Sequence, residues 1–145
     1  MITVEHSIEI RRPVEAVFAF VSDPRHLPEW QAAVQEVRVT PDGPPAVGTR
    51  VTHVISFLGV KLEPTTECTA LEPNRSFRFK GVSGPLAVEG ASHCEATSEG
   101  TRLSSTFQME PGGLFKVAGP VFASQLKKQS EADLQRLKAL LEAQT

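Results

Sequence analysis

The chain has 145 residues, of which 40% are hydrophobic and 22% are charged, and its formal net charge is −2. This composition is that of one ordinary globular domain, and it excludes a long disordered tail, a coiled-coil rod and a collagen-like chain. A net charge of −2 provides no basic field for a polyphosphate backbone, so nucleic-acid binding is not expected. We therefore expect a single domain over residues 1–145.

The apolar runs are too short for a secretory signal or a membrane span. The first residues alternate apolar and polar side chains, whereas a signal peptide needs about 7–15 consecutive apolar residues. The longest apolar run covers residues 16–21, and crossing a bilayer takes roughly 20 residues. We expect no transmembrane segment and a cytoplasmic location.

One strand and two short helices are predicted at the start of the chain. Residues 2–10 read as a β-strand, because apolar and polar side chains alternate along them. Pro13 then begins a helix whose apolar residues recur at helical spacing over residues 14–21. Asp23 is the predicted N-cap of a second short helix, which continues through Trp30.

From about residue 34 the apolar period changes to two, which indicates a series of β-strands. Turn signals such as Pro41–Pro45 and Ser98–Gly100 separate them, and such short turns predict an antiparallel meander. The predicted strands cover residues 34–40, 49–58, 60–71, 75–81, 86–97 and 101–109.

The last part of the chain is predicted to be one long helix. After a linker at residues 110–113, leucines fall on one stripe of the helix, at positions 126, 134, 137 and 141. Gly119 and Pro120 lie near the start of this segment, and the proline should kink or divide the helix there. The leucine stripe needs an apolar partner, which the concave face of a curved sheet would supply.

These motifs together resemble the START/Bet v 1-like (SRPBCC) superfamily, and in particular its bacterial polyketide cyclase/dehydrase-like members. The resemblance rests on Ile8–Phe18, Asp23-Pro24, Leu27–Trp30, Gly48-Thr49-Arg50, Leu71–Arg75 and Gly100–Leu103. It implies an α+β helix-grip fold, with two short helices after the first strand. In that fold a curved seven-stranded antiparallel sheet wraps around a long C-terminal helix and leaves an apolar cavity between them.

Members of this superfamily include lipid and hormone carriers, aromatic cyclases, coenzyme Q-binding proteins and chaperone-associated modules. The fold alone does not choose among these functions.

Alternation along the strands predicts which side chains face the helix. Many inward positions carry small residues, namely Thr66, Gly90, Ser92, Cys94, Ala96 and Ser105. Small side chains on the inner face of a curved sheet leave a void of the kind that binds a small molecule. Alternatively, phenylalanines close this space, namely Phe57, Phe77, Phe79, Phe107, Phe115 and Phe122.

We predict a ligand-binding set from the inward positions together with the helices. It comprises Trp30, Val51, His53, Ile55, Phe57, Thr66, Cys68, Phe77, Phe79, Val88, Ser92, Cys94, Leu103, Ser105, Phe107, Val117, Val121 and Phe122.

His53 is the candidate catalytic residue, because it lies mid-strand between Val51 and Ile55. An imidazole in an apolar pocket can exchange a proton or a hydrogen bond with a ligand carbonyl or hydroxyl. The alternative is a structural histidine that is bonded to a backbone group or to a neighbouring hydroxyl. His6 shares the apolar face of its strand and has the same two interpretations.

The two cysteines are predicted to be free thiols. Cys68 and Cys94 lack CxxC or other metal-ligand spacing, so no metal site and no cofactor are predicted. The predicted strand 75–81 lies between theirs, which separates the two cysteines by about 9–10 Å. A disulfide tolerates a Cα separation of only about 7 Å.

Three functions are compatible with these patterns. The first is binding or transport of a hydrophobic or aromatic small molecule in the internal cavity. The second is a polyketide cyclase or dehydratase with His53 as acid or base. The third is a protein-interaction module that uses the apolar hairpin tip at residues 57–60 and the long helix. A homodimer is also possible.

Overall fold

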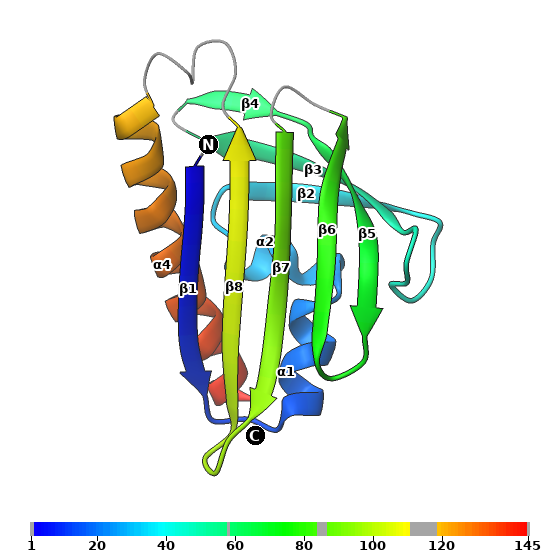
Figure 1. The fold of residues 1–145 in the computed structure, drawn as a ribbon, viewed down its shortest axis with the longest axis vertical. Coiled ribbons are helices and arrows are strands. Elements are labelled where there is room, and N and C mark those ends of the chain that lie inside the picture. The colour runs from blue at the N-terminus through cyan, green and yellow to red at the C-terminus, as the bar shows by residue number, and fades with distance from the viewer. Residues whose placement is uncertain (1, 58, 84–86, 111–118, 145) are drawn as a thin grey trace.

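The structure is a computed structural model that describes residues 2–57, 59–83, 87–110 and 119–144. A curved antiparallel sheet surrounds short helices that follow the first strand, and a long helix ends the chain (Figure 1). The elements are β1 (Ile2–Ile10), α1 (Val14–Val21), the 3-10 helix η1 (Pro24–His26), α2 (Leu27–Trp30), β2 (Val34–Thr40), β3 (Arg50–Phe57), β4 (Val60–Leu62), β5 (Thr65–Glu72), β6 (Ser76–Ser83), β7 (Ala87–Ala96), β8 (Thr101–Glu110) and α4 (Gly119–Ala143).

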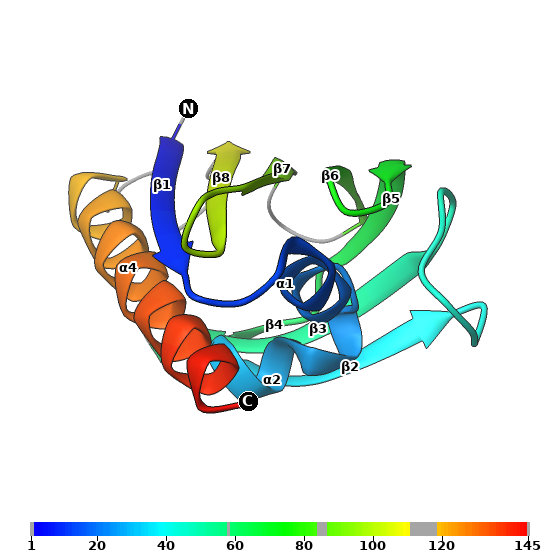
Figure 2. The same cartoon turned by 90° about the horizontal axis from the view of Figure 1, so that it is seen from below.

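The sheet follows the order β1-β8-β7-β6-β5-β3-β2, and the short β4 is paired with β3. Figure 2 shows the sheet bent into a U, with β1, β8, β7, β6 and β5 on one side and β3 and β2 on the other. α4 closes the open side of the U next to β1, and α1 lies inside it at one end (Figure 2). This arrangement confirms the predicted helix-grip fold.

One predicted strand is divided in the structure. The sequence pattern predicts a single strand over residues 60–71, but β4 and β5 are separated at Glu63 and Pro64. Proline has no N–H to donate to a ladder, so the strand is interrupted at this position. The Pro64 carbonyl still accepts a hydrogen bond from the His53 backbone N–H at 2.9 Å. Both pieces therefore remain paired with β3.

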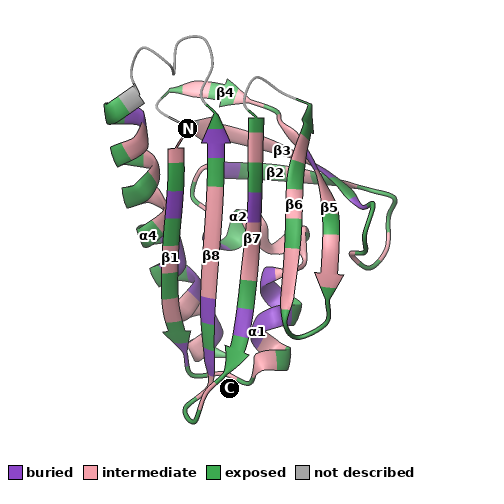
Figure 3. Ribbon diagram, viewed as in Figure 1, coloured by how far each residue is buried: buried purple, intermediate pink, exposed green. Residues whose placement is uncertain are grey.

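The packed core fills the end of the U that α1 occupies. Val17 and Phe18 of α1 belong to one buried cluster with Leu137 and Leu141 of α4. The Phe18 ring meets Phe77 of β6 edge to face, with ring centroids 6.2 Å apart. Figure 3 shows buried stretches on α1 and on the adjoining ends of β7 and β8, with further buried stretches on β1 and near the other end of β8. The opposite end of the inner sheet face has no such cover from α1.

The predicted kink or division near the start of α4 is absent from the described residues. Pro120 lies in the first turn of the helix, where a proline removes no intrahelical hydrogen bond. Within the described part of the chain, α4 then continues without interruption to Ala143. The predicted leucine stripe is confirmed, since Leu134, Leu137 and Leu141 are buried. No helix in the described ranges is long and apolar enough to span a membrane.

Candidate ligand cavity

A cavity of about 330 Å³ lies between the inner face of the sheet and one face of α4. Residues of α4 at helical spacing form one wall, from Phe122 through Leu126 to Leu134. The neighbouring wall is a row of side chains in register across five strands. This row consists of His6, Ser105, Ser92, Phe77 and Leu71.

Gly90 belongs to the next row of the sheet, and its role differs from the one predicted. It pairs with Phe79 on β6, and a Cβ added at Gly90 would lie 2.4 Å from the Phe79 ring. The glycine therefore makes room for a phenylalanine ring and leaves no space for a ligand. Gly90 itself does not line the cavity, whereas the paired Ser92 and Ser105 do.

Cys94 was predicted to bind the ligand, but it is not part of the cavity wall. Its side chain faces inward as predicted, but it is buried in the core cluster with Leu103 and Phe18 and does not line the cavity. Cys94 lies further toward the α1 end of β7 than Ser92, so α1 covers it. Burial raises the pKa of the Cys94 thiol to about 11. Cys68 lines the cavity, and both cysteines are free thiols, as predicted.

Val121 is the second residue that was predicted to bind the ligand and does not line the cavity. Its side chain is 62% exposed, whereas the next residue, Phe122, is buried in the cavity wall. Successive helical residues are rotated by about 100°, so only one of these two neighbours can face inward. Val117 and the side chain of Phe57 lie outside the described residues. The other predicted members line the cavity, namely Trp30, Val51, His53, Ile55, Thr66, Cys68, Phe77, Phe79, Val88, Ser92, Leu103, Ser105, Phe107 and Phe122.

His53 is both a cavity residue and a hydrogen-bonded one. Its Nε2 is 3.1 Å from the Thr66 hydroxyl oxygen on the neighbouring strand β5. Burial lowers the pKa of His53 to about 4, so the imidazole is neutral at pH 7. Neutral imidazole has one donor and one acceptor nitrogen. Its Nδ1 makes no hydrogen bond to any described residue. Nδ1 is an acceptor when Nε2 donates to Thr66, and a donor when Nε2 accepts from it.

A polar cluster on α4 was not predicted from the sequence. Asp133 is buried and lines the cavity, and its Oδ1 accepts hydrogen bonds from the Ala32 N–H at 3.1 Å and from Gln129 Nε2 at 3.0 Å. Arg136 lies 3.4 Å from the same oxygen and also donates to the Trp30 carbonyl at 3.1 Å. Burial raises the pKa of Asp133, and these donors oppose that shift.

This cluster ties α4 to the segment that joins α2 and β2. The sequence signal for it is the spacing, because Asp133 lies seven residues after Leu126 and four before Leu137. That position places a carboxylate on the leucine stripe. A charged residue on a buried stripe indicates a paired group.

Two buried polar atoms of residues that line the cavity have no partner within the described residues. Trp30 Nε1 and His6 Nε2 are buried, and neither atom forms a hydrogen bond with a described residue. Leaving a buried polar group unsatisfied costs about 1–3 kcal/mol. Both residues line the cavity through other atoms, since these two nitrogens are themselves buried.

Comparisons with known proteins place the chain in a family. The family model for polyketide cyclase / dehydrase and lipid transport matches residues 1–142. Solved structures with the same fold include a protein from Thermus thermophilus, with a TM-score of 0.83 and 21% identity over 97% of each chain. No curated protein matches the sequence.

Two further solved structures come from named classes of protein. A START superfamily protein from Mycobacterium smegmatis has a TM-score of 0.74 and 19% identity over 99% of this chain and 96% of that one. The Zhui aromatase/cyclase from Streptomyces sp. R1128 has a TM-score of 0.76 and 16% identity over 97% and 93%. Because the family model spans almost the whole sequence, this chain belongs to the polyketide cyclase / dehydrase and lipid transport family.

Proposed function

We propose that this protein binds and carries a hydrophobic or aromatic small molecule in the cavity between the sheet and α4. The observation that carries the proposal is the void itself, since about 330 Å³ remains open beside a buried hydrophobic core cluster. A well-packed domain of this size keeps few voids larger than a water molecule. A volume of roughly 300–1,000 Å³ is typical of small-molecule sites.

Affinity would come mainly from burial of the ligand's apolar surface. The wall is dominated by apolar side chains such as Val51, Ile55, Phe107 and Phe122. An aromatic group that buries about 200 Å² gains roughly 5 kcal/mol before the costs of association. His53, Ser92 and Ser105 would fix the ligand's orientation through hydrogen bonds.

A cyclase or dehydratase is the second candidate function. The family description and the similarity to an aromatase/cyclase favour it. The state of His53 argues against its use as a general base, because a pKa of about 4 makes the imidazole a weak base at neutral pH. A carrier requires only a neutral hydrogen-bonding group at this position, so ligand binding is the better supported function.

A protein-interaction module is the third candidate, and it requires a filled interior and an exposed apolar patch. The open cavity supports ligand binding instead. The apolar tip proposed for such an interaction includes Leu58, which lies outside the described residues. The homodimer stays a prediction, which the mass of the protein in solution would check.

The test of the proposed function is native mass spectrometry of the freshly purified protein, followed by solvent extraction. We expect a co-purified apolar molecule, and a rise in the melting temperature when that molecule is added back. Trp30 reports on the cavity directly, because the chain has one tryptophan and no tyrosine. A protein without co-purified ligand, whose Trp30 emission and melting temperature do not respond to apolar aromatic compounds, would contradict the proposal.

His53→Ala separates the carrier from the enzyme. A carrier with this substitution loses one hydrogen bond to its ligand, so the dissociation constant should rise by about tenfold at most. An enzyme that uses His53 as acid or base would keep its ligand affinity and lose turnover by about a hundredfold or more. Ligand consumption by the wild-type protein that disappears in His53→Ala would establish the second function over the first.

A further inference from the structure

We propose that the cavity selects uncharged ligands and rejects those that bear a carboxylate, sulfonate or phosphate group. This inference rests on the proposed ligand-binding function and specifies its chemistry. It would make the physiological ligand an apolar molecule whose polar groups are hydroxyls or carbonyls. Such selection is decided by the charged and polar groups that reach the cavity wall.

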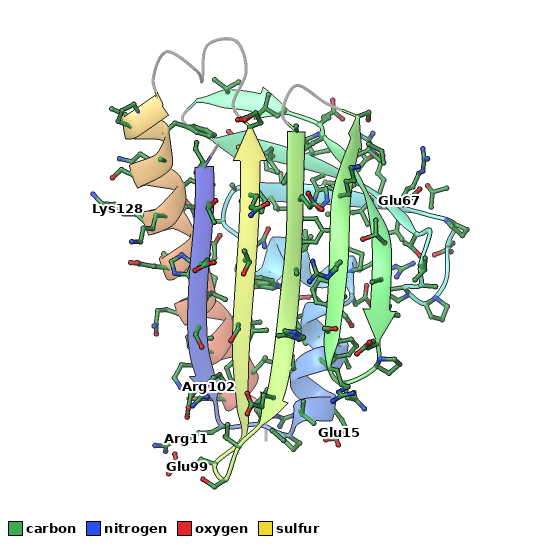
Figure 4. All side chains as sticks on the ribbon, viewed as in Figure 1. Arg11, Glu15, Glu67, Glu99, Arg102 and Lys128 are labelled. Atoms are coloured by element: carbon green, nitrogen blue, oxygen red, sulfur yellow. The ribbon has the colours of Figure 1, made fainter. Side chains whose placement is uncertain are left out.

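The wall offers no cationic side chain among the residues that the structure describes. Arg78 is the one arginine or lysine of the described lining, and it lies on β6 between the inward-facing Phe77 and Phe79. Alternation therefore directs its exposed side chain to the outer face of the sheet. Figure 4 shows Lys128 extending away from α4, and Arg102 forms an ion pair with Glu9 on the outside of the sheet.

The fixed charges near the cavity are negative or already paired. Asp133 contributes a carboxylate to the wall, and Arg136, its partner, does not line the cavity. The C-terminal end of α1 also reaches the wall at Val21 and Ser22. The carbonyl end of a helix carries a partial negative charge, which disfavours an anion.

The remaining polar groups of the wall are suited to neutral partners. Thr66, Ser92 and Ser105 provide hydroxyls, and His53 provides an imidazole that burial keeps uncharged at pH 7. A ligand anion would have to lose its hydration without gaining a cation, which is far more costly than losing one hydrogen bond.

The experiment compares two fluorescent probes with the same skeleton. N-phenyl-1-naphthylamine is uncharged, and 8-anilino-1-naphthalenesulfonate carries one sulfonate on that skeleton. Each is titrated into the intact protein at pH 7, with probe emission and quenching of Trp30 as the two readouts. We expect the uncharged probe to bind at least tenfold more tightly. Equal affinities, or tighter binding of the sulfonate, would overturn the inference and leave the proposed function standing.

If neither probe binds or quenches Trp30, the ligand-binding function fails, and the inference fails with it. This outcome differs from the previous one, so the two failures are distinguishable. The comparison uses the wild-type protein and does not depend on whether any variant folds.

A charge placed in the wall provides the second arm. Ser105→Arg adds a cation inside the cavity, and Gln108→Arg adds the same group on the exposed outer phase of β8. We expect the sulfonate probe to bind at least tenfold more tightly to Ser105→Arg than to wild type, with no change for Gln108→Arg. Far-ultraviolet circular dichroism verifies that both variants are folded. A folded Ser105→Arg variant without this gain would show that charge does not control selection.

Discussion

A single imidazole determines how one wall of the cavity responds to pH. The folded protein holds His53 neutral down to a pKa of about 4, because burial penalises the charged form. An unfolded histidine titrates near its model value of 6.5. Between these two values the unfolded state binds more protons than the folded state. The free energy of unfolding must therefore fall as the pH is lowered from about 6.5 toward 4.

The first prediction measures this contribution. Between pH 7 and pH 5, the His53 linkage should remove about 2 kcal/mol of stability from the wild-type protein. Urea unfolding at the two pH values checks this, and His53→Gln should lack that part of the loss. His93→Gln is the matched control, because His93 is exposed on the outer face of β7. An equal pH dependence in His53→Gln and wild type would contradict the prediction.

The second residue-scale prediction concerns Gly90. Adding one methyl group, as Gly90→Ala, forces the Phe79 ring to move, since the two would lie 2.4 Å apart. Overpacking of this kind costs about 1–3 kcal/mol in the free energy of unfolding. The double variant with Phe79→Leu should recover most of the loss, because the smaller side chain frees the space. Additive losses in the double variant would show that the ring is not the cause.

At the scale of elements, the contact between α4 and α2 depends on one carboxylate. Asp133 accepts hydrogen bonds from Ala32 and Gln129 and forms an ion pair with Arg136. Arg136 also donates a hydrogen bond to the Trp30 carbonyl. These contacts fix the wall of the cavity that α4 provides. Leu137 and Leu141 further along α4 belong to the buried core cluster and do not line the cavity, so the two halves of this helix have different roles.

The third prediction concerns these contacts of Asp133. Asp133→Ala leaves the Ala32 N–H and the Arg136 guanidinium without their acceptor, which should lower the free energy of unfolding by about 1–3 kcal/mol. Chemical denaturation measures the loss, and the Trp30 emission should shift to the red as α2 loosens. Glu131→Gln on the exposed face of α4 is the control and should be neutral. A loss below the error of the measurement would show that α2 is held by apolar packing alone.

At the scale of the whole molecule, the open volume and the stability are coupled. A void lined by apolar groups lacks the dispersion contacts that a filled core would have. Ser105 lines this void, and in the cross-strand row it lies between His6 and Ser92. Filling the space should therefore stabilise the fold while it displaces the ligand.

Ser105→Leu is the fourth prediction and tests this coupling. The extra side chain should weaken binding of N-phenyl-1-naphthylamine by at least tenfold and raise the free energy of unfolding by about 1 kcal/mol. Ser104→Leu places the same group on the opposite face of β8 and should leave binding unchanged. Undiminished probe binding in Ser105→Leu would place the probe outside the cavity.

Much of the cavity wall could be predicted from alternation, and the two errors show where this reasoning ends. Cys94 was correctly assigned to the inner face, but alternation does not say how far along that face α1 reaches. Val121 was wrongly paired with Phe122, because both are apolar and only the helix rotation separates them. Asp133 was missed, because its partner Ala32 lies 101 residues away in the sequence.

The sequence by itself determined the order of the elements, the facing of each strand and the family, because caps, turns and hydrophobic periods act over a few residues. The tertiary structure alone decided where the inner face is packed and where it is open. That outcome depends on the distance between α4 and the sheet, which contacts between remote residues set. The same long-range packing decided which polar groups found partners, and so which chemistry the cavity presents to a ligand.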